Sequence, residues 1–80
     1  MDNTPNYYKG KTYGIEARKV IEDYQADNYN IGTAITYLLR AGKKDGNPIS
    51  QDIQKAIDHL YFELDRQSKI NNILTGGIAK

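Results

Sequence analysis

The segment from residue 29 to residue 44 places the tightest constraint on the fold, because its apolar residues recur at the spacing of one helix face. These residues follow the pattern i, i+3, i+4, i+7 and i+8 along the segment: Ile31, Ala34, Ile35, Leu38 and Leu39. This spacing predicts an α-helix whose apolar face joins the core. Asn30 is a candidate N-cap for this helix, and Gly42 suits the left-handed position that closes a helix.

Positive charge gathers where this predicted helix ends. Arg40, Lys43 and Lys44 lie on either side of Gly42. Such a cluster can bind a small anion through charge-assisted hydrogen bonds. It can equally serve only to complement the negative end of the helix dipole. Both interpretations stay open at the level of sequence.

Two further amphipathic segments predict two more helices. The first runs from residue 15 to about residue 26. The second is expected to be capped by Ser50, to carry Asp52 in its first turn and to reach about residue 69. Its apolar stripe is the longest in the chain: Ile53, Ala56, Ile57, Leu60, Tyr61 and Leu64. Residues 1–14 contain Pro5, Gly10 and Gly14, which indicates an extended arm, and residues 70–80 favour a loosely ordered tail.

The composition bounds the architecture. The chain has 80 residues, no cysteine and one histidine, so disulfides are excluded and a dedicated metal site is not expected. A core of this size is only marginally stabilising by itself. We therefore expect an all-α fold, in which one domain forms a compact three-helix protomer that assembles as a homo-oligomer, a dimer or tetramer. The sequence contains no apolar run long enough for a membrane span, which favours a cytoplasmic protein.

The charge pattern favours a local phosphate site over a nucleic-acid track. Eleven basic and ten acidic residues give a net charge of +1, too balanced for a protein that coats duplex DNA. The sequence lacks the spacing of a phosphate-binding P-loop, and its AGKKDG segment is only weakly similar to one. Its carboxylates are scattered, and Glu16 and Asp52 are the candidates to hold magnesium if a kinase site is assembled between subunits.

Tyrosine dominates the aromatic residues: the chain has seven tyrosines, one phenylalanine and no tryptophan. A tyrosine ring can stack on a nucleobase while its hydroxyl forms hydrogen bonds. Tyr24 and Tyr61 are in phase with helical apolar positions and are expected in the core, and Tyr29 is expected as a staple before its helix. The remaining tyrosines are candidates for a site: Tyr7, Tyr8, Tyr13 and Tyr37. His59 is expected to be partly buried or at an interface.

Three blocks of the sequence, in the order PNYYKGKTYGIEARKVIED, IGTAITYLLRAGKK and DIQKAIDHLYFELDR, carry a resemblance to a known family. They resemble a family of small bacteriophage proteins with patterns close to HYxxGxIExIDxI, GNAIKYIxRAGKK and DLxKAxxYLxxL, and the likeness covers most of residues 5 to 66. That family is associated with a nucleotide kinase of short-tailed phages, and small phage proteins of this kind include sponges for nucleotide immune signals. The resemblance implies nucleotide binding in the cytoplasm of an infected bacterium.

These observations together predict capture of a small nucleotide, with a cyclic di- or oligonucleotide of antiviral signalling as one such ligand. The expected ligand residues are Tyr8, Lys9, Gly10, Asn30, Thr33, Tyr37, Arg40, Lys43 and Lys44. We expect no catalytic residue, cofactor or metal, and no membrane or duplex nucleic acid as partner. The alternatives are a nucleoside monophosphate kinase and a protein that inhibits a host enzyme by binding to it.

Overall fold

The computed structural model describes residues 5–74, and all of its regular elements are helices. The elements are a short 3-10 helix η1 (Asn6–Tyr8) and three α-helices, α1 (Ala17–Tyr24), α2 (Tyr29–Arg40) and α3 (Ile49–Leu74). The described residues contain no β-strand, and an isolated antiparallel bridge joins Lys9 to Glu16. The all-α prediction is therefore confirmed.

The helix starts differ from those predicted. Asn28, and not Asn30, caps α2, because its side-chain oxygen accepts a hydrogen bond from the Ile31 amide at 2.9 Å. Helix α3 begins at Ile49, directly after Pro48, so Ser50 lies inside the first turn and does not cap the helix. Proline can stand at such a boundary because the first turn of a helix needs no amide hydrogen from it. Helix α1 is shorter than the predicted range of residues 15–26.

Gly42 is required in the turn that follows α2. Its backbone has a φ angle of 76°, which confirms the predicted left-handed conformation. A Cβ atom at this position would also clash with Cγ1 of Ile49, at the start of α3. Glycine therefore serves both the turn and the close approach of the two helix ends.

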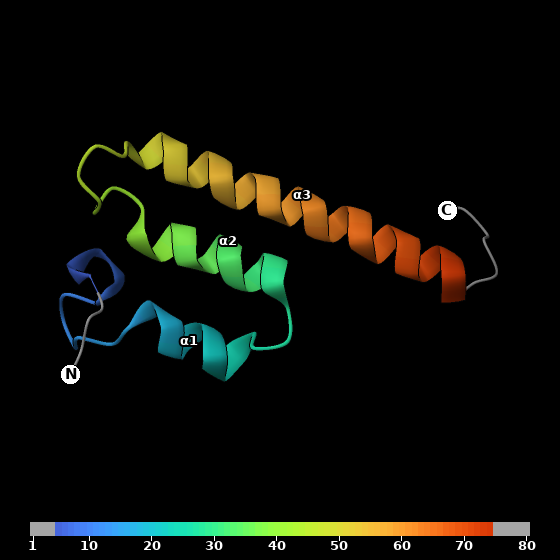
Figure 1. Cartoon of the computed structure of the whole chain (residues 1–80), viewed down its shortest axis with the longest axis horizontal. Helices are drawn as coiled ribbons and strands as arrows, with labels where there is room; N and C mark the ends of the chain where they lie inside the picture. Colours follow the sequence, from blue (N-terminus) through green and yellow to red (C-terminus); the bar gives the residue numbers. More distant parts are fainter. Residues whose placement is uncertain (1–4, 75–80) are drawn as a thin grey trace.

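The three helices lie side by side, with α2 between α1 and α3 (Figure 1). The described chain measures 48 × 26 × 19 Å and has a radius of gyration of 15.7 Å. A compact domain of 80 residues would have a radius of gyration of about 12 Å. The prediction of a compact protomer is thus wrong, because α3 is more than twice as long as α2 and extends beyond it (Figure 1).

The described protomer has almost no apolar core of its own. Its buried apolar side chains are three alanines, Ala17, Ala34 and Ala56. Tyr24 and Tyr61, which the sequence places in the core, are 76% and 66% exposed. Most of the apolar residues predicted to be buried on α2 and α3 are exposed as well: Leu38, Leu39, Ile53, Ile57, Leu60 and Leu64.

The reason for these errors is the orientation of α3. Its residues that contact α2 include Asp52, His59 and Glu63, which are polar, and the apolar stripe lies to one side of them. The periodicity therefore identified the helix correctly but assigned its apolar face to the wrong neighbour. Among the helices within residues 5–74, none combines the length and apolar character needed to cross a membrane.

The N-terminal segment folds back on the body instead of extending from it. After η1, the amide of Gly10 donates to the carbonyl of Ile15 at 2.9 Å, and Gly14 closes the turn with a φ angle of 68°. The extended arm predicted for residues 1–14 is therefore wrong for its described part. Of the predicted tail, residues 70–74 are helical, while residues 1–4 and 75–80 lie outside the described range.

Candidate functional site

A buried ion pair joins the end of α2 to the start of α3. The Arg40 side chain donates to Oδ1 of Asp52 from Nη2 at 2.9 Å and from Nε at 3.2 Å. The two side chains are only 6% and 0% exposed. The hydrogen bonds from Arg40 lower the pKa of Asp52 below its ordinary value, so the carboxylate stays charged.

This pair changes the role that the sequence suggests for both residues. Arg40 was expected to face a phosphate as a free cation, but its charge is offset by Asp52 within the protein. Asp52, a candidate for magnesium binding, is enclosed against Arg40 and does not face solvent. The sequence could not show this pairing. The two residues are twelve positions apart, and their contact depends on how α2 and α3 pack against each other.

Aromatic rings surround the Arg40 guanidinium, and lysines lie beyond them. The guanidinium carbon is 4.9 Å from the ring centre of Tyr37 and 6.0 Å from those of Tyr7 and Tyr8. Nη1 of Arg40 also donates a hydrogen bond of 3.1 Å to the Tyr8 hydroxyl. The ammonium groups flank this group on both sides: Lys44 lies 5.5 Å from the ring of Tyr7, and Lys55 lies 5.4 Å from that of Tyr37. Cations and rings thus alternate, an arrangement that attracts further aromatic or anionic groups.

A second aromatic group continues from Tyr37 and centres on His59. The His59 ring stacks on Tyr37 with ring centres 5.9 Å apart and an interplanar angle of 29°. Tyr29 and Phe62 meet the imidazole edge-on, at 5.8 and 5.4 Å. Their own rings remain open to solvent, with Tyr29 76% and Phe62 57% exposed. The prediction that His59 is partly buried is confirmed.

Sequence reasoning missed Lys55 and Phe62 as parts of this group, and it assigned Tyr29 only a structural role. A usable signal was present, because Lys55, His59 and Phe62 are spaced by four and three residues and so share one face of α3. That face is separate from the apolar stripe that drew attention to the helix. A search for polar and aromatic residues at helical spacing would have found it.

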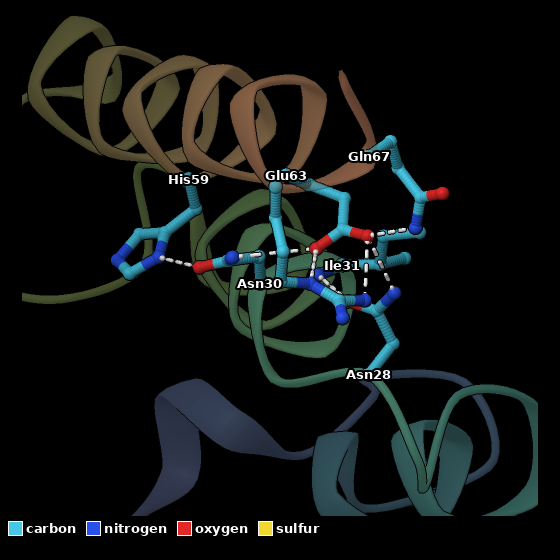
Figure 2. Close-up of polar contacts among 7 residues, drawn as sticks. Asn28, Asn30, Ile31, His59, Glu63 and Gln67 are labelled. Atoms are coloured by element: carbon cyan, nitrogen blue, oxygen red, sulfur yellow. Dashed lines mark hydrogen bonds and ion pairs between the residues drawn. The ribbon is translucent and has the colours of Figure 1, made fainter. Parts of the chain in front are cut away.

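One turn after His59 on α3, Glu63 organises a polar network between α2 and α3 (Figure 2). Its carboxylate accepts two hydrogen bonds from Arg66, at 3.0 and 2.8 Å, and one from Gln67 at 2.6 Å. Asn28, the N-cap of α2, and Asn30, in its first turn, donate to the same carboxylate at 3.1 and 3.3 Å. These bonds, with Arg66 as the largest contributor, lower the pKa of Glu63 to about 2.

The network predicts loss of stability in acid. Because the pKa of Glu63 is about 2 in the folded chain and 4.5 in its ordinary state, its contribution is complete above about pH 5 and disappears as the pH falls towards 2. We expect Glu63→Gln to lower the melting temperature at pH 7 by on the order of 10 °C and to flatten its dependence on pH below 5. Thermal melts between pH 2 and pH 7 measure this, and part of the acid loss should remain because of Asp52.

Asp65→Asn is the matched control, since it removes a carboxylate that is 68% exposed on the same helix. This variant should melt within about 2 °C of the wild type at pH 7. Equal melting temperatures for Glu63→Gln and Asp65→Asn would show that the Glu63 network does not stabilise the fold.

Two neighbouring hollows lie along the groove between α1 and α2, and Ile21 and Thr36 line both. The larger, of about 440 Å³, is bordered by Tyr29, Thr33 and Asp27 among others. The second, of about 380 Å³, lies between the N-terminal segment and α1, where its walls are mostly apolar. Volumes of this size can accept a small organic ligand. Tyr29 connects the larger hollow to the aromatic group around His59.

The predicted ligand residues divide among three places. Tyr8, Tyr37 and Arg40 are in direct contact, and Lys44 joins them through Tyr7. A third hollow, of about 200 Å³, brings together three more of the predicted residues with Tyr8: Lys9, Gly10 and Lys43.

The other two predicted residues lie nearer the start of α2. Asn30 is engaged with Glu63 and lies 3.3 Å from Nδ1 of His59 through its own Oδ1 atom. Thr33 lines the 440 Å³ hollow. The structure therefore distributes the predicted residues over the N-terminal segment, α2 and the turn after α2, and it does not gather them into one basic corner. Within the described part of the chain, no group of three or more histidine, cysteine, aspartate or glutamate side chains is arranged to hold a metal ion.

A family model described as a protein of unknown function (DUF3310) matches residues 2–61, which is 60 of the 80 residues. No curated protein and no solved structure matches the chain. The matched range includes η1, α1, α2 and the first half of α3, and so it contains most of the aromatic and basic residues described above.

Proposed function

The chain belongs to the DUF3310 family, and we propose that it is a bacteriophage protein that binds a small nucleotide without converting it. In this proposal the protein acts as a homo-oligomer in the cytoplasm of an infected bacterium. There it sequesters a nucleotide signal of antiviral defence, such as a cyclic dinucleotide. The likeness of the three sequence blocks to small phage proteins supports the phage origin, and the geometry of one face supports the ligand.

One observation carries the proposal: two solvent-exposed rings, Tyr29 and Phe62, flank His59 beside a cation and a hollow. An exposed ring next to an imidazole offers a surface on which a nucleobase can stack. Lys55, one turn before His59 on α3, supplies a positive charge for a phosphate. The 440 Å³ hollow beside Tyr29 gives space for the base or sugar, with Thr33 and Asn28 as polar groups.

The roles of the sequence-predicted residues follow from their surroundings. The ring of Tyr37 contacts Arg40, Lys55 and His59, so we assign it to positioning the platform. Arg40 is likewise a positioning residue, because Asp52 offsets its charge. Lys44 and Lys43 remain candidate phosphate ligands near the end of α2. This assignment moves the base contact from Tyr8 to Tyr29 and Phe62.

Binding without turnover is preferred over a nucleotide kinase because of where the candidate carboxylates lie. Phosphoryl transfer needs carboxylates that hold magnesium beside the phosphates. Asp52 is committed to Arg40, and Glu16 lies at the start of α1 beside Arg18, at 3.4 Å. A direct assay for transfer of the γ-phosphate from ATP to nucleoside monophosphates separates the two functions.

Lys55→Ala tests the proposal by isothermal titration calorimetry. The ligand panel is AMP, GMP, ATP, cyclic di-AMP, cyclic di-GMP and cyclic GMP-AMP. We expect wild-type protein to bind at least one of them, and Lys55→Ala to weaken that affinity about 10- to 100-fold, as expected for a lost charge-assisted hydrogen bond.

Lys69→Ala is the control, because Lys69 is a 74% exposed lysine on the same helix, paired with Asp65 away from the aromatic group. Its affinity should equal that of the wild type. If both variants lost the same affinity, the loss would come from the lower net charge of the protein and not from a specific contact of Lys55. Absence of binding to the whole panel would contradict this function.

A further inference from the structure

One broad face of the protomer is apolar and uncovered. On α2 and α3 its exposed members are between 38% and 65% exposed: Leu38, Ile49, Ile53, Ile57, Leu60 and Leu64. Ile31 and Ile35, which are half-buried, belong to the same stripe of α2. The protomer thus exposes six large apolar side chains on this face, but the apolar side chains that it buries among the described residues are only three alanines.

The apolar residues of the two helices lie on the same side of the helix layer. On α2, Ile31 and Leu38 each follow a residue that contacts α3, namely Asn30 and Tyr37. On α3, the same holds for Ile53, Leu60 and Leu64, which follow Asp52, His59 and Glu63. One residue corresponds to a rotation of about 100° around a helix. On both helices, the apolar residues are therefore rotated by about 100°, in the same sense, from the line along which the helices contact each other.

The relative direction of the two helices determines to which face of the α2–α3 layer the apolar stripes point. Contacts pair Asn30 with Glu63 at one end and Arg40 with Asp52 at the other, so α2 and α3 run antiparallel. A half-turn about an axis normal to the layer interchanges two antiparallel helices and leaves the faces of the layer unchanged. The same rotation from the contact line therefore points both apolar stripes to one face, opposite to the aromatic group.

The spacing of these residues is that of helix bundles. Ile53, Ile57, Leu60 and Leu64 are separated by four, three and four residues, and Ile31, Ile35 and Leu38 by four and three. Such spacing produces the seam through which helices pack in coiled coils and four-helix bundles. The face is thus built to receive two further helices.

The area of the face fits a second copy of this chain. With the exposures above, it presents roughly 600–700 Å² of apolar surface, close to the ~800 Å² that each partner of a standard interface buries. A surface of this size on a stable monomer would exceed the largest apolar patch usually tolerated in water. A self-complementary face is also what a two-fold dimer requires.

We propose that two protomers dimerise face to face through α2 and α3, forming a four-helix core from the two apolar faces. The second copy supplies the core that each protomer lacks. The aromatic group around His59 and the 440 Å³ hollow stay on the outer surface of the dimer. The dimer does not depend on nucleotide binding, so either can fail without the other.

Light scattering coupled to size exclusion at micromolar concentration tests the dimer. The wild type should have twice the 9.1 kDa mass of one chain. Ile57→Asp, which places a charge in the seam, should give a monomer or an unfolded chain by circular dichroism. Gln51→Asp, an exposed change on the other side of α3, should leave the dimer intact. A folded wild-type monomer would overturn the proposal, and its sedimentation with phospholipid vesicles would then assign the face to a membrane surface.

Cross-linking tests the face without disrupting it. The chain has no cysteine, so Leu60→Cys introduces a single thiol in the seam. A short bismaleimide should link two Leu60→Cys chains efficiently, whereas Gln51→Cys chains should remain mostly single. A dimer in solution with the reverse preference would place the interface elsewhere and overturn the proposed geometry.

Discussion

Replacing Arg40 with methionine should lower the free energy of unfolding by about 3–5 kcal/mol, as is typical when one partner of a buried ion pair is removed. Asp52 would remain as a buried charge without its ion-pair partner. Because small domains are stable by only about 5–15 kcal/mol, this variant should be largely unfolded at moderate urea concentrations. Urea denaturation followed by circular dichroism measures the change.

A double variant provides the sharper test. Arg40→Met combined with Asp52→Leu removes both charges, so it should recover much of the lost stability, since a buried ion pair contributes little beyond an apolar replacement. Arg18→Met is the control, because Arg18 pairs with Glu22 at 2.9 Å on an exposed surface and should matter by less than about 1 kcal/mol. If Arg40→Met and Arg18→Met had equal stability, the buried pair would not hold α2 to α3.

Truncating Phe62 should cause a large loss of ligand affinity. Phe62→Ala removes an exposed ring from the platform, and we expect nucleotide affinity to fall by about 1–3 kcal/mol, the range for a lost base-stacking contact. The fold should be little affected, since the ring is 57% exposed. Calorimetry with the nucleotide that wild-type protein binds best measures the loss, and Phe62→Tyr should retain most of the affinity because it keeps the ring face.

Tyr61→Ala is the matched control. Tyr61 is the neighbouring aromatic residue and is 66% exposed. Because it follows His59 by two residues, it lies about 200° around α3 from His59. Its removal should leave affinity unchanged. If Tyr61→Ala weakened binding as much as Phe62→Ala did, the effect would come from the helix as a whole and not from stacking at the proposed platform.

The helices themselves could be predicted from the sequence because their signals are local. Apolar spacing found all three helices, and the need for a left-handed residue after α2 found Gly42. The predicted helix starts were less accurate. Both Asn28 and Asn30 are good capping residues, and only the backbone geometry selects between them. Proline at residue 48 similarly displaced the start of α3 from Ser50.

The packing could not be predicted, because periodicity shows that a face is buried without showing what buries it. The stripe that includes Ile53 and Ile57 was assigned to the core of the protomer, yet the polar side of α3 contacts α2. Two carboxylates on that side, Asp52 and Glu63, find partners on other parts of the chain. Burial of charged groups in partnered networks leaves no pattern in the sequence alone.

Part of the candidate site could be predicted from the sequence. Tyr8, Tyr37 and Arg40 were singled out from the sequence, and the structure brings them into contact. The pairing of Arg40 with Asp52 and the grouping around His59 depend on long-range packing, so they appeared only with the fold. The expectation that the ligand is a nucleotide came from the resemblance and stays a prediction.

Mass spectrometry of the retained ligand tests nucleotide capture most directly. Purified protein is incubated with an equimolar mixture of the nucleotide panel, passed through a desalting column and heated to release what it holds. Capture without turnover predicts that one nucleotide is retained in near-stoichiometric amount and returned chemically intact. Retention of no nucleotide, or release of a phosphorylated or hydrolysed product, would contradict the account.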